Sequence, residues 1–205
     1  MDITHERALV EQAKTDPAAF GEIFDAYYPK ILNYTARRTG DATAAQDITA
    51  ETFTKALRKL STFRWRGISI EAWLFAIATN ELRMYFRSQR HHASLEELQE
   101  CDGFEPMADT DLHLELVEAQ NHLERQHTFY RAQHILLTLP IKYQEVIALR
   151  FMEGKKISEI AVILKKPDGT IKSLLSRGLG LVRKRLNVQP NARRSIITPE
   201  GTKRI

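Results

Sequence analysis

The side chains best suited to chemistry lie between residues 168 and 186, where hydroxyl groups and cations share one face of a predicted helix. The apolar positions of this segment recur every three or four residues and predict a buried face; they are Ile171, Leu174, Leu175 and Leu179. The polar positions that point away from them are Thr170, Lys172, Ser173, Ser176 and Arg177. Hydroxyl and cationic side chains donate hydrogen bonds to phosphates and base edges, so this segment points to nucleic-acid contact.

A second, shorter helix precedes this one across a break. Apolar residues at helical spacing predict a helix over 157–164, and Lys165 to Pro167 interrupt the pattern. Ala161 is small enough to let two helices approach closely. The arrangement is that of a helix-turn-helix, whose second helix can enter a DNA major groove. The alternative is an ordinary helical hairpin with a solvated basic face.

Aromatic and cationic residues are also interleaved between residues 63 and 87. Rings can stack on unpaired bases, and cations can hold the backbone of a single strand. The side chains with these properties, together with one amide that suits a base edge, are Phe63, Arg64, Trp65, Arg66, Trp73, Asn80, Arg83, Tyr85 and Arg87. The alternative interpretation is that Trp73, Phe75 and Tyr85 form part of a hydrophobic core.

The charge of the chain is segregated along its length. Residues 58–91 carry 7 basic and 2 acidic side chains, and residues 128–205 carry 16 and 5, which makes them net +5 and net +11. Between them, residues 94–127 carry 1 basic and 10 acidic side chains, net −9. Two basic blocks separated by an acidic one suggest a polyanionic partner that is contacted at two places.

The composition argues against several other classes of protein. With 43% hydrophobic residues over 205 positions, the chain can form packed cores. Cys101 is its one cysteine, and His91 and His92 lack the spacing of metal ligands, so neither a disulfide framework nor a zinc site is expected. The longest apolar run is too short for a bilayer and no signal peptide is evident, so we expect a cytoplasmic protein without membrane insertion.

The remaining pattern predicts helices throughout. Asp16 and Pro17 open a helix that Pro29 interrupts; Gly40 ends the next helix, and Asp41 or Thr43 caps the one after it. That helix turns Ile48, Phe53, Ala56 and Leu57 inward. The predicted helical ranges are 5–15, 17–28, 30–39, 44–60, 71–88, 112–138, 141–152, 157–164 and 168–186. Gly178 and Gly180 lower the helix propensity of the last range.

Three motifs, in order, resemble those of a sigma-70-type RNA polymerase sigma factor of the small, extracytoplasmic-function kind. Residues 47–56 (DITAETFTKA) are similar to the helix that binds the polymerase clamp. Residues 73–87 (WLFAIATNELRMYFR) are similar to the helix that binds the −10 promoter element. Residues 139–154 together with 169–173 are similar to region 4 of that family.

The resemblance implies an all-α fold with two helical domains joined by a flexible acidic linker. It assigns residues 1–90 to a region 2 bundle, 91–127 to the linker, 128–187 to a region 4 helix-turn-helix that binds the −35 element, and 188–205 to a mobile basic tail. Such a protein binds core RNA polymerase through its β′ clamp and β flap, directs it to promoter DNA and assists promoter melting. It has no catalytic residues, cofactor or metal of its own.

The resemblance also assigns roles to individual residues. Those expected to bind the polymerase are Asp47, Glu51, Thr52 and Phe53. Those expected to bind DNA are Arg64, Trp65, Asn80, Arg83, Arg87, Thr170, Lys172, Ser173, Ser176 and Arg177. An anti-sigma factor is a further partner that the resemblance allows, although no residue of the sequence identifies one.

Other functions stay open at this point. A helix-turn-helix regulator that acts without polymerase would explain residues 157–185 but would leave 63–87 without a role. An enzyme acting on nucleic acid would need a carboxylate cluster or a nucleophile–base pair in a basic region, and residues 58–91 offer only Glu71 and Glu81 as acids. An RNA-binding antiterminator is a further minor alternative.

Overall fold

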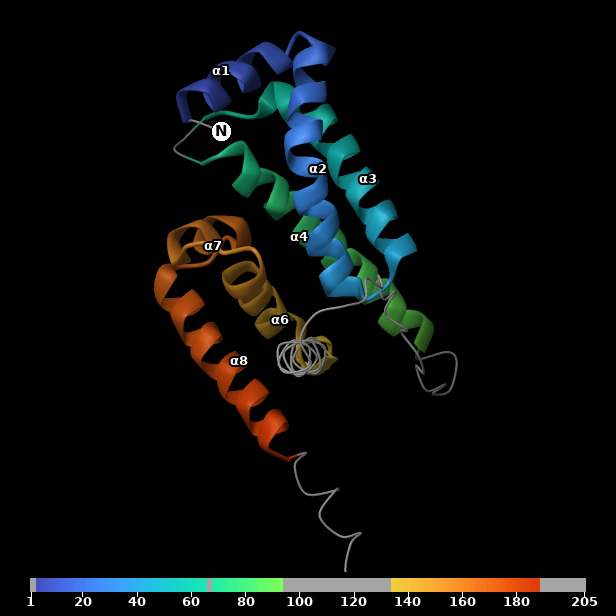
Figure 1. The fold of residues 1–205 in the computed structure, drawn as a ribbon, viewed down its shortest axis with the longest axis vertical. Helices are drawn as coiled ribbons and strands as arrows, with labels where there is room; N and C mark the ends of the chain where they lie inside the picture. The colour runs from blue at the N-terminus through green and yellow to red at the C-terminus, as the bar shows by residue number, and fades with distance from the viewer. Residues whose placement is uncertain (1–2, 66–67, 94–133, 189–205) are drawn as a thin grey trace, which may run out of the picture.

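The computed structural model describes residues 3–65, 68–93 and 134–188, and its regular elements there are all helical (Figure 1). The first group comprises α1 (Ile3–Ala13), α2 (Pro17–Thr39), α3 (Ala42–Lys59), the short η1 (Leu60–Thr62) and α4 (Ile70–Ala93). The second comprises α6 (Ile141–Ile147), the π-helical turn η2 (Ala148–Met152), α7 (Ile157–Leu164) and α8 (Asp168–Val188). The predicted all-α class is confirmed. Most of the predicted linker, the tail and most of the predicted helix 112–138 lie outside the described residues.

The helix ends of the first group follow the local chemistry of the sequence. The Asp16 carboxylate accepts a hydrogen bond from the Ala18 amide at 2.9 Å and so caps α2. Gly40 ends that helix in the left-handed conformation, with φ of 69°. Asp41, one of the two predicted caps, accepts from the amides of Thr43 and Ala44 at the start of α3. These caps set the tight α2–α3 hairpin.

Pro29 does not interrupt its helix, and this prediction was wrong. α2 runs unbroken from Pro17 to Thr39 with Pro29 inside it. Proline removes one backbone donor, which leaves the carbonyl of Asp25 without its usual helical partner. Asp25 and Pro29 are both exposed, so water can donate a hydrogen bond to the Asp25 carbonyl. On the opposite face Tyr27 and Ile31 are buried and hold the helix to the bundle.

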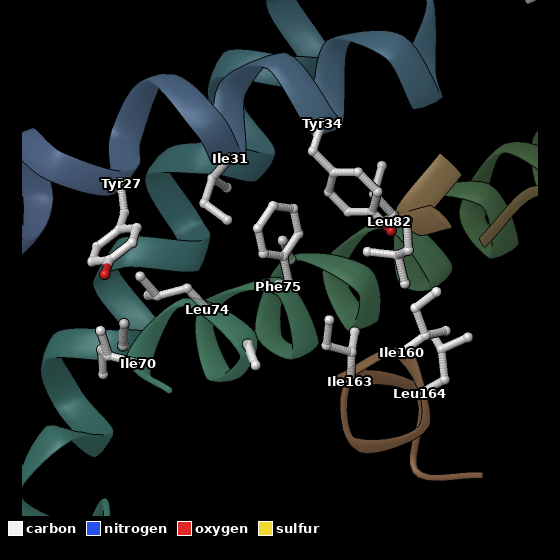
Figure 2. Close-up of a cluster of buried hydrophobic side chains, with 14 of the residues drawn as sticks. Tyr27, Ile31, Tyr34, Ile70, Leu74, Phe75, Leu82, Ile160, Ile163 and Leu164 are labelled. Carbon is white, nitrogen blue, oxygen red and sulfur yellow. The ribbon is translucent and has the colours of Figure 1, made fainter. Parts of the chain in front are cut away.

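The core of the first group lies where α2 and α3 pack against α4. Tyr34 of α2 meets Phe75 of α4 edge to face (Figure 2), with ring centroids 5.2 Å apart. The Tyr34 hydroxyl lies 3.0 Å from the Thr79 hydroxyl. Leu57 was predicted to face inward but is 51% exposed, because α3 turns Phe53, Ala56 and Leu60 to the core instead.

The second group is built around the predicted helix-turn-helix. α7 ends at Lys165, whose backbone is left-handed with φ of 54°, and the Lys166 amide closes the turn onto the Ala161 carbonyl at 2.9 Å. α8 then packs on both α6 and α7. Its inner face carries Ile171, Leu175 and Gly178, whereas Leu179, predicted to be apolar core, is 38% exposed.

The two groups share one continuous hydrophobic core. α4 packs directly against α7. Figure 2 shows Ile160, Ile163 and Leu164 of α7 close to α4, which carries Phe75 and Leu82 in the same buried cluster. The sequence patterns predicted the helices on both sides of this contact but not the contact itself.

Candidate nucleic-acid interface

The first candidate surface is the outer face of α8. All five residues predicted to bind DNA there are exposed: Thr170, Lys172, Ser173, Ser176 and Arg177. The buried Ile171 and Leu175 orient this face away from α6 and α7. The Ser173 hydroxyl donates its hydrogen bond to the Thr170 carbonyl within the helix. In this conformation its oxygen can therefore only accept a hydrogen bond from a ligand. The face presents hydroxyls and cations immediately after the turn, where a recognition helix meets a groove.

The second candidate surface is the segment between η1 and α4. Arg64 is exposed, and Trp65 is half-buried with its ring edge-on to Phe63, the two centroids being 6.4 Å apart. The Trp73 ring also packs against Phe63, with the two centroids 4.9 Å apart, and adjoins the hydrophobic core. Both tryptophans are thus partly buried at the margin of the core, and Trp65 is the one that directly follows an exposed cation, Arg64.

The polar residues of α4 predicted to bind DNA have unequal environments. Asn80 and Arg87 are exposed. Arg83 is engaged by Glu145 of α6, with its Nε 2.6 Å from Oε1 and its Nη2 2.7 Å from Oε2, and its Nη1 donates to Asn80 at 3.3 Å. Hydrogen bonds to the Glu145 carboxylate raise the pKa of Arg83. A DNA strand could reach Arg87 and Asn80 in this conformation more readily than Arg83.

The four residues predicted to bind polymerase do not share a surface. Asp47 is exposed on α3, and Glu51 is partly exposed and lies 3.2 Å from Lys55. Thr52 and Phe53 are buried: the Thr52 hydroxyl donates to the Ile48 carbonyl, and the Phe53 ring packs against Phe24. The last two side chains belong to the core and are left out of the candidate docking face.

Sequence reasoning missed a residue that sets the start of α4. The Glu6 carboxylate is buried, and its Oε1 accepts from the Ile70 amide at 2.9 Å and from the Tyr27 hydroxyl at 3.2 Å. Burial, followed by the charge of Glu6, raises the pKa of Tyr27. An acid in an amphipathic first helix carries no signal that it caps a helix 64 residues away.

Two further residues missed in the sequence, Glu145 and Lys155, join the helical groups. Lys155 is buried, its Nζ lies 2.7 Å from Glu71, and it sits 4.7 Å from the centre of the Phe75 ring. Burial alone would raise the pKa of Glu71, but hydrogen bonds from Lys155 and Lys30 outweigh it and lower that pKa. A buried charge at a helical position looks the same in sequence as an exposed one.

Within the described ranges, no three His, Cys, Asp or Glu residues are grouped so that they could hold a metal ion. No helix in that part of the chain combines the length and the hydropathy that crossing a bilayer requires.

Comparison with known proteins agrees with the motifs. Residues 23–92 match the family model described as Sigma-70 region 2, and residues 130–181 match that of Sigma-70, region 4. The chain is 30% identical over 191 residues to the ECF RNA polymerase sigma factor SigW of Bacillus subtilis, covering 91% of this chain and 98% of that protein. It is 32% identical over 173 residues to the ECF RNA polymerase sigma factor BldN of Streptomyces coelicolor, covering 83% of this chain but 62% of that longer protein.

The fold is also found among solved structures. The sigma factor RpoE of Bartonella quintana, solved in complex with the anti-sigma factor NepR, superimposes with a TM-score of 0.61 at 23% identity, covering 83% of this chain and 98% of that one. The matches cover both helical groups in the same order. The chain belongs to the sigma-70 family of RNA polymerase sigma factors, within its extracytoplasmic-function group.

Proposed function

We propose that this chain binds core RNA polymerase in the cytoplasm, directs it to specific promoters and assists strand separation, and that it has no catalytic activity of its own. The observation that carries the proposal is the outer face of α8, where the second helix of the helix-turn-helix exposes hydroxyls and cations while its inner face is buried in the hydrophobic core. Membership of the sigma-70 family supports the polymerase as partner.

Docking on the polymerase clamp is assigned to the exposed acids of α3. Asp47 and Glu51 are one turn apart and both reach solvent. Reversal of both charges in Asp47→Arg with Glu51→Arg is expected to abolish binding to core polymerase, measured by fluorescence titration of the full chain. The matched control is Glu22→Arg with Asp25→Arg, which reverses two exposed charges on α2. Equal affinities for the two double variants would contradict the assignment, and helicity measured by circular dichroism shows whether each variant folds.

Upstream promoter reading is assigned to α8. Lys172 is proposed to contact mainly phosphates, because it follows the turn and lies beside Ser173 on the outer face. Arg177 is assigned a mixed role. Loss of a phosphate contact weakens binding to all sequences alike and lowers the slope of log affinity against log salt concentration by about 1. Loss of a base contact costs about 1–3 kcal/mol of binding free energy on the correct site.

The test is run-off transcription by the reconstituted holoenzyme, with promoters altered in the upstream element. Lys172→Ala should reduce transcription from all promoters alike and make it less dependent on salt. Arg177→Ala should also reduce the discrimination between promoters. Lys184→Ala removes the same charge from the distal, exposed part of α8 and is the control. If Lys172→Ala and Arg177→Ala both retain upstream discrimination and salt sensitivity, as the control does, α8 is not the reader.

Two further partners follow from the same family. We propose that the second helical group contacts the β flap while α8 lies on DNA. An anti-sigma factor is proposed as a regulator because the RpoE structure similar to this fold holds one. The competing proposal, a regulator that acts on duplex DNA alone, requires DNA-dependent activity without co-purification of core polymerase, so a pull-down from a cell extract separates the two.

A further inference from the structure

The turn between α7 and α8 contains a backbone conformation that its residue type disfavours. α7 ends at Lys165, whose φ of 54° and ψ of 50° lie in the left-handed region. Among the described residues, Gly40 and Gly154 also have positive φ, and Lys165 is the one that is not a glycine. In this region the β-carbon crowds the next carbonyl oxygen, so a helix that ends in this way usually does so at glycine or asparagine. Lysine at this position therefore keeps a strain that glycine would relieve.

The turn is held by its backbone, and the Lys165 side chain takes no part in it. The Lys165 amide donates to the Val162 carbonyl at 3.2 Å, and the Lys166 amide donates to the Ala161 carbonyl at 2.9 Å. The Lys165 side chain is exposed and forms no ion pair or hydrogen bond with the described residues. Strained backbone positions concentrate at functional sites, so the charge of this side chain needs a partner outside the fold.

The turn leads directly into the face of α8 that is proposed to read DNA (Figure 1). All residues from 165 to 170 are exposed, and Lys172 and Arg177 continue the exposed face along α8. A helix with its side chains is about 10–12 Å across, and the major groove of DNA is about 12 Å wide. A helix that enters the groove therefore fills it, and the turn that leads into this helix lies beside the phosphates at the edge of the groove.

The acids near the turn do not neutralise Lys165. Asp168 lies in the first turn of α8, where the helix dipole favours its charge. Glu159 lies at the far end of α7 and accepts a hydrogen bond from the Lys156 amide at 2.7 Å. Neither carboxylate forms an ion pair with Lys165, and the neighbouring Lys166 adds a second exposed cation. The ammonium of Lys165 is thus available to an anionic ligand.

We infer that Lys165 binds a backbone phosphate of promoter DNA, at the edge of the groove that α8 enters. Such a contact rests on the proposed function, in which α8 reads the upstream promoter element. Phosphate contacts carry no sequence information, but they fix the register and the orientation of a protein on the duplex. Lys165 is therefore a positioning residue for the recognition helix. Glycine at this position would remove the strain and the contact together.

The test is the binding of reconstituted holoenzyme to a fluorescent duplex fragment of a promoter that the wild-type holoenzyme transcribes. Lys165→Asn removes the charge and introduces a residue that tolerates the left-handed conformation. The variant should lower the slope of log affinity against log salt concentration by about 0.9. The affinity advantage of the wild type should accordingly shrink about 3.5-fold between about 50 and 200 mM salt. Lys165→Arg keeps the charge and should keep the wild-type slope.

The matched control removes the same charge from the opposite end of α7. Lys156 is the exposed N-cap residue of that helix, and asparagine is a favourable N-cap, so Lys156→Asn should keep the wild-type slope. In urea unfolding of the full chain, Lys165→Asn should be at least as stable as the wild type, because it relieves the strain. The inference is overturned if Lys165→Asn keeps the wild-type slope, if Lys156→Asn lowers it equally, or if Lys165→Asn loses stability together with affinity.

Two further measurements separate this contact from the other assignments. If Lys165→Asn weakens the binding of core polymerase in a fluorescence titration and leaves the slope for DNA unchanged, the lysine contacts protein and the inference fails. Lys172→Ala is measured in parallel. A lower slope for Lys172→Ala alone refutes only the role of Lys165, whereas wild-type slopes for both variants refute the assignment of α8 as well. A wild-type chain that directs the polymerase to no promoter would overturn the proposed function and this contact with it.

Discussion

Two glycines of α8 offer a measurement of how tightly the second group is packed. Gly178 and Gly180 lie two residues apart in the same helix, but only Gly178 faces α6. A β-carbon at position 178 would lie 3.0 Å from Ile147 Cδ1 and 3.2 Å from Tyr143 Cβ, whereas at position 180 it would meet nothing within 4 Å. Alanine is therefore expected to have opposite effects at the two positions.

The magnitude follows from two terms. Alanine in a helix interior is favoured over glycine by about 1 kcal/mol at either site. At position 178 this gain is opposed by overpacking, which typically costs about 1–3 kcal/mol. The Ile147 terminus can move, but Tyr143 Cβ is fixed to the backbone of α6, so the contact cannot be relieved by rotation alone. Gly180→Ala should raise the free energy of unfolding by up to about 1 kcal/mol, and Gly178→Ala should lower it by about 0–2 kcal/mol.

The assay is urea unfolding of the full chain, monitored by circular dichroism with both variants in parallel. The double variant Gly178→Ala with Ile147→Val should be more stable than the sum of the two single effects predicts, because Ile147→Val deletes the nearest atom, Cδ1. Equal stabilisation by alanine at positions 178 and 180 would refute the reasoning, since it would mean that α8 does not press on α6. A coupling energy of zero between Gly178→Ala and Ile147→Val would locate any strain elsewhere.

The remaining predictions concern the first group. Glu6→Ala should destabilise the fold by about 1–3 kcal/mol in thermal or urea unfolding, because it leaves the buried Ile70 amide without its acceptor, and Glu6→Gln, which keeps an acceptor oxygen, should cost less. Because the pKa of Glu71 is lowered in the folded state, this carboxylate stabilises the fold above its unfolded pKa and loses that contribution as the pH falls through its folded pKa. Glu71→Gln should therefore flatten the loss of stability between about pH 5 and pH 3, and an unchanged acid limb would contradict the ion pairs seen at that site. Trp65→Ala should reduce open-complex formation, measured by permanganate footprinting, more than it reduces closed-complex formation, because stacking one base on an aromatic ring is worth about 1–3 kcal/mol. If the variant opens promoters as well as the wild type does, Trp65 has only a packing role.

The sequence by itself determined the local features of this protein. Apolar spacing predicted the helices, and the chemistry of Asp16, Gly40 and Asp41 predicted where they begin and end. The outer face of α8 was also predictable, since its hydroxyls and cations alternate with apolar residues along one short segment. The exception, Pro29, shows that a local helix breaker yields when the buried face of a long helix is anchored on both sides of it.

Only the tertiary structure decided which charges are buried and which residues meet across the two groups. The resemblance grouped Thr52 with the solvent-facing Asp47, although Thr52 lies one turn from the inward-facing Ile48, and the structure shows that Thr52 is buried. Arg83, Glu145 and Lys155 had the same appearance in sequence as any solvated charge. Their pairing depends on how α4 packs against the second group, and contacts between residues more than 60 positions apart leave no periodic trace along the chain.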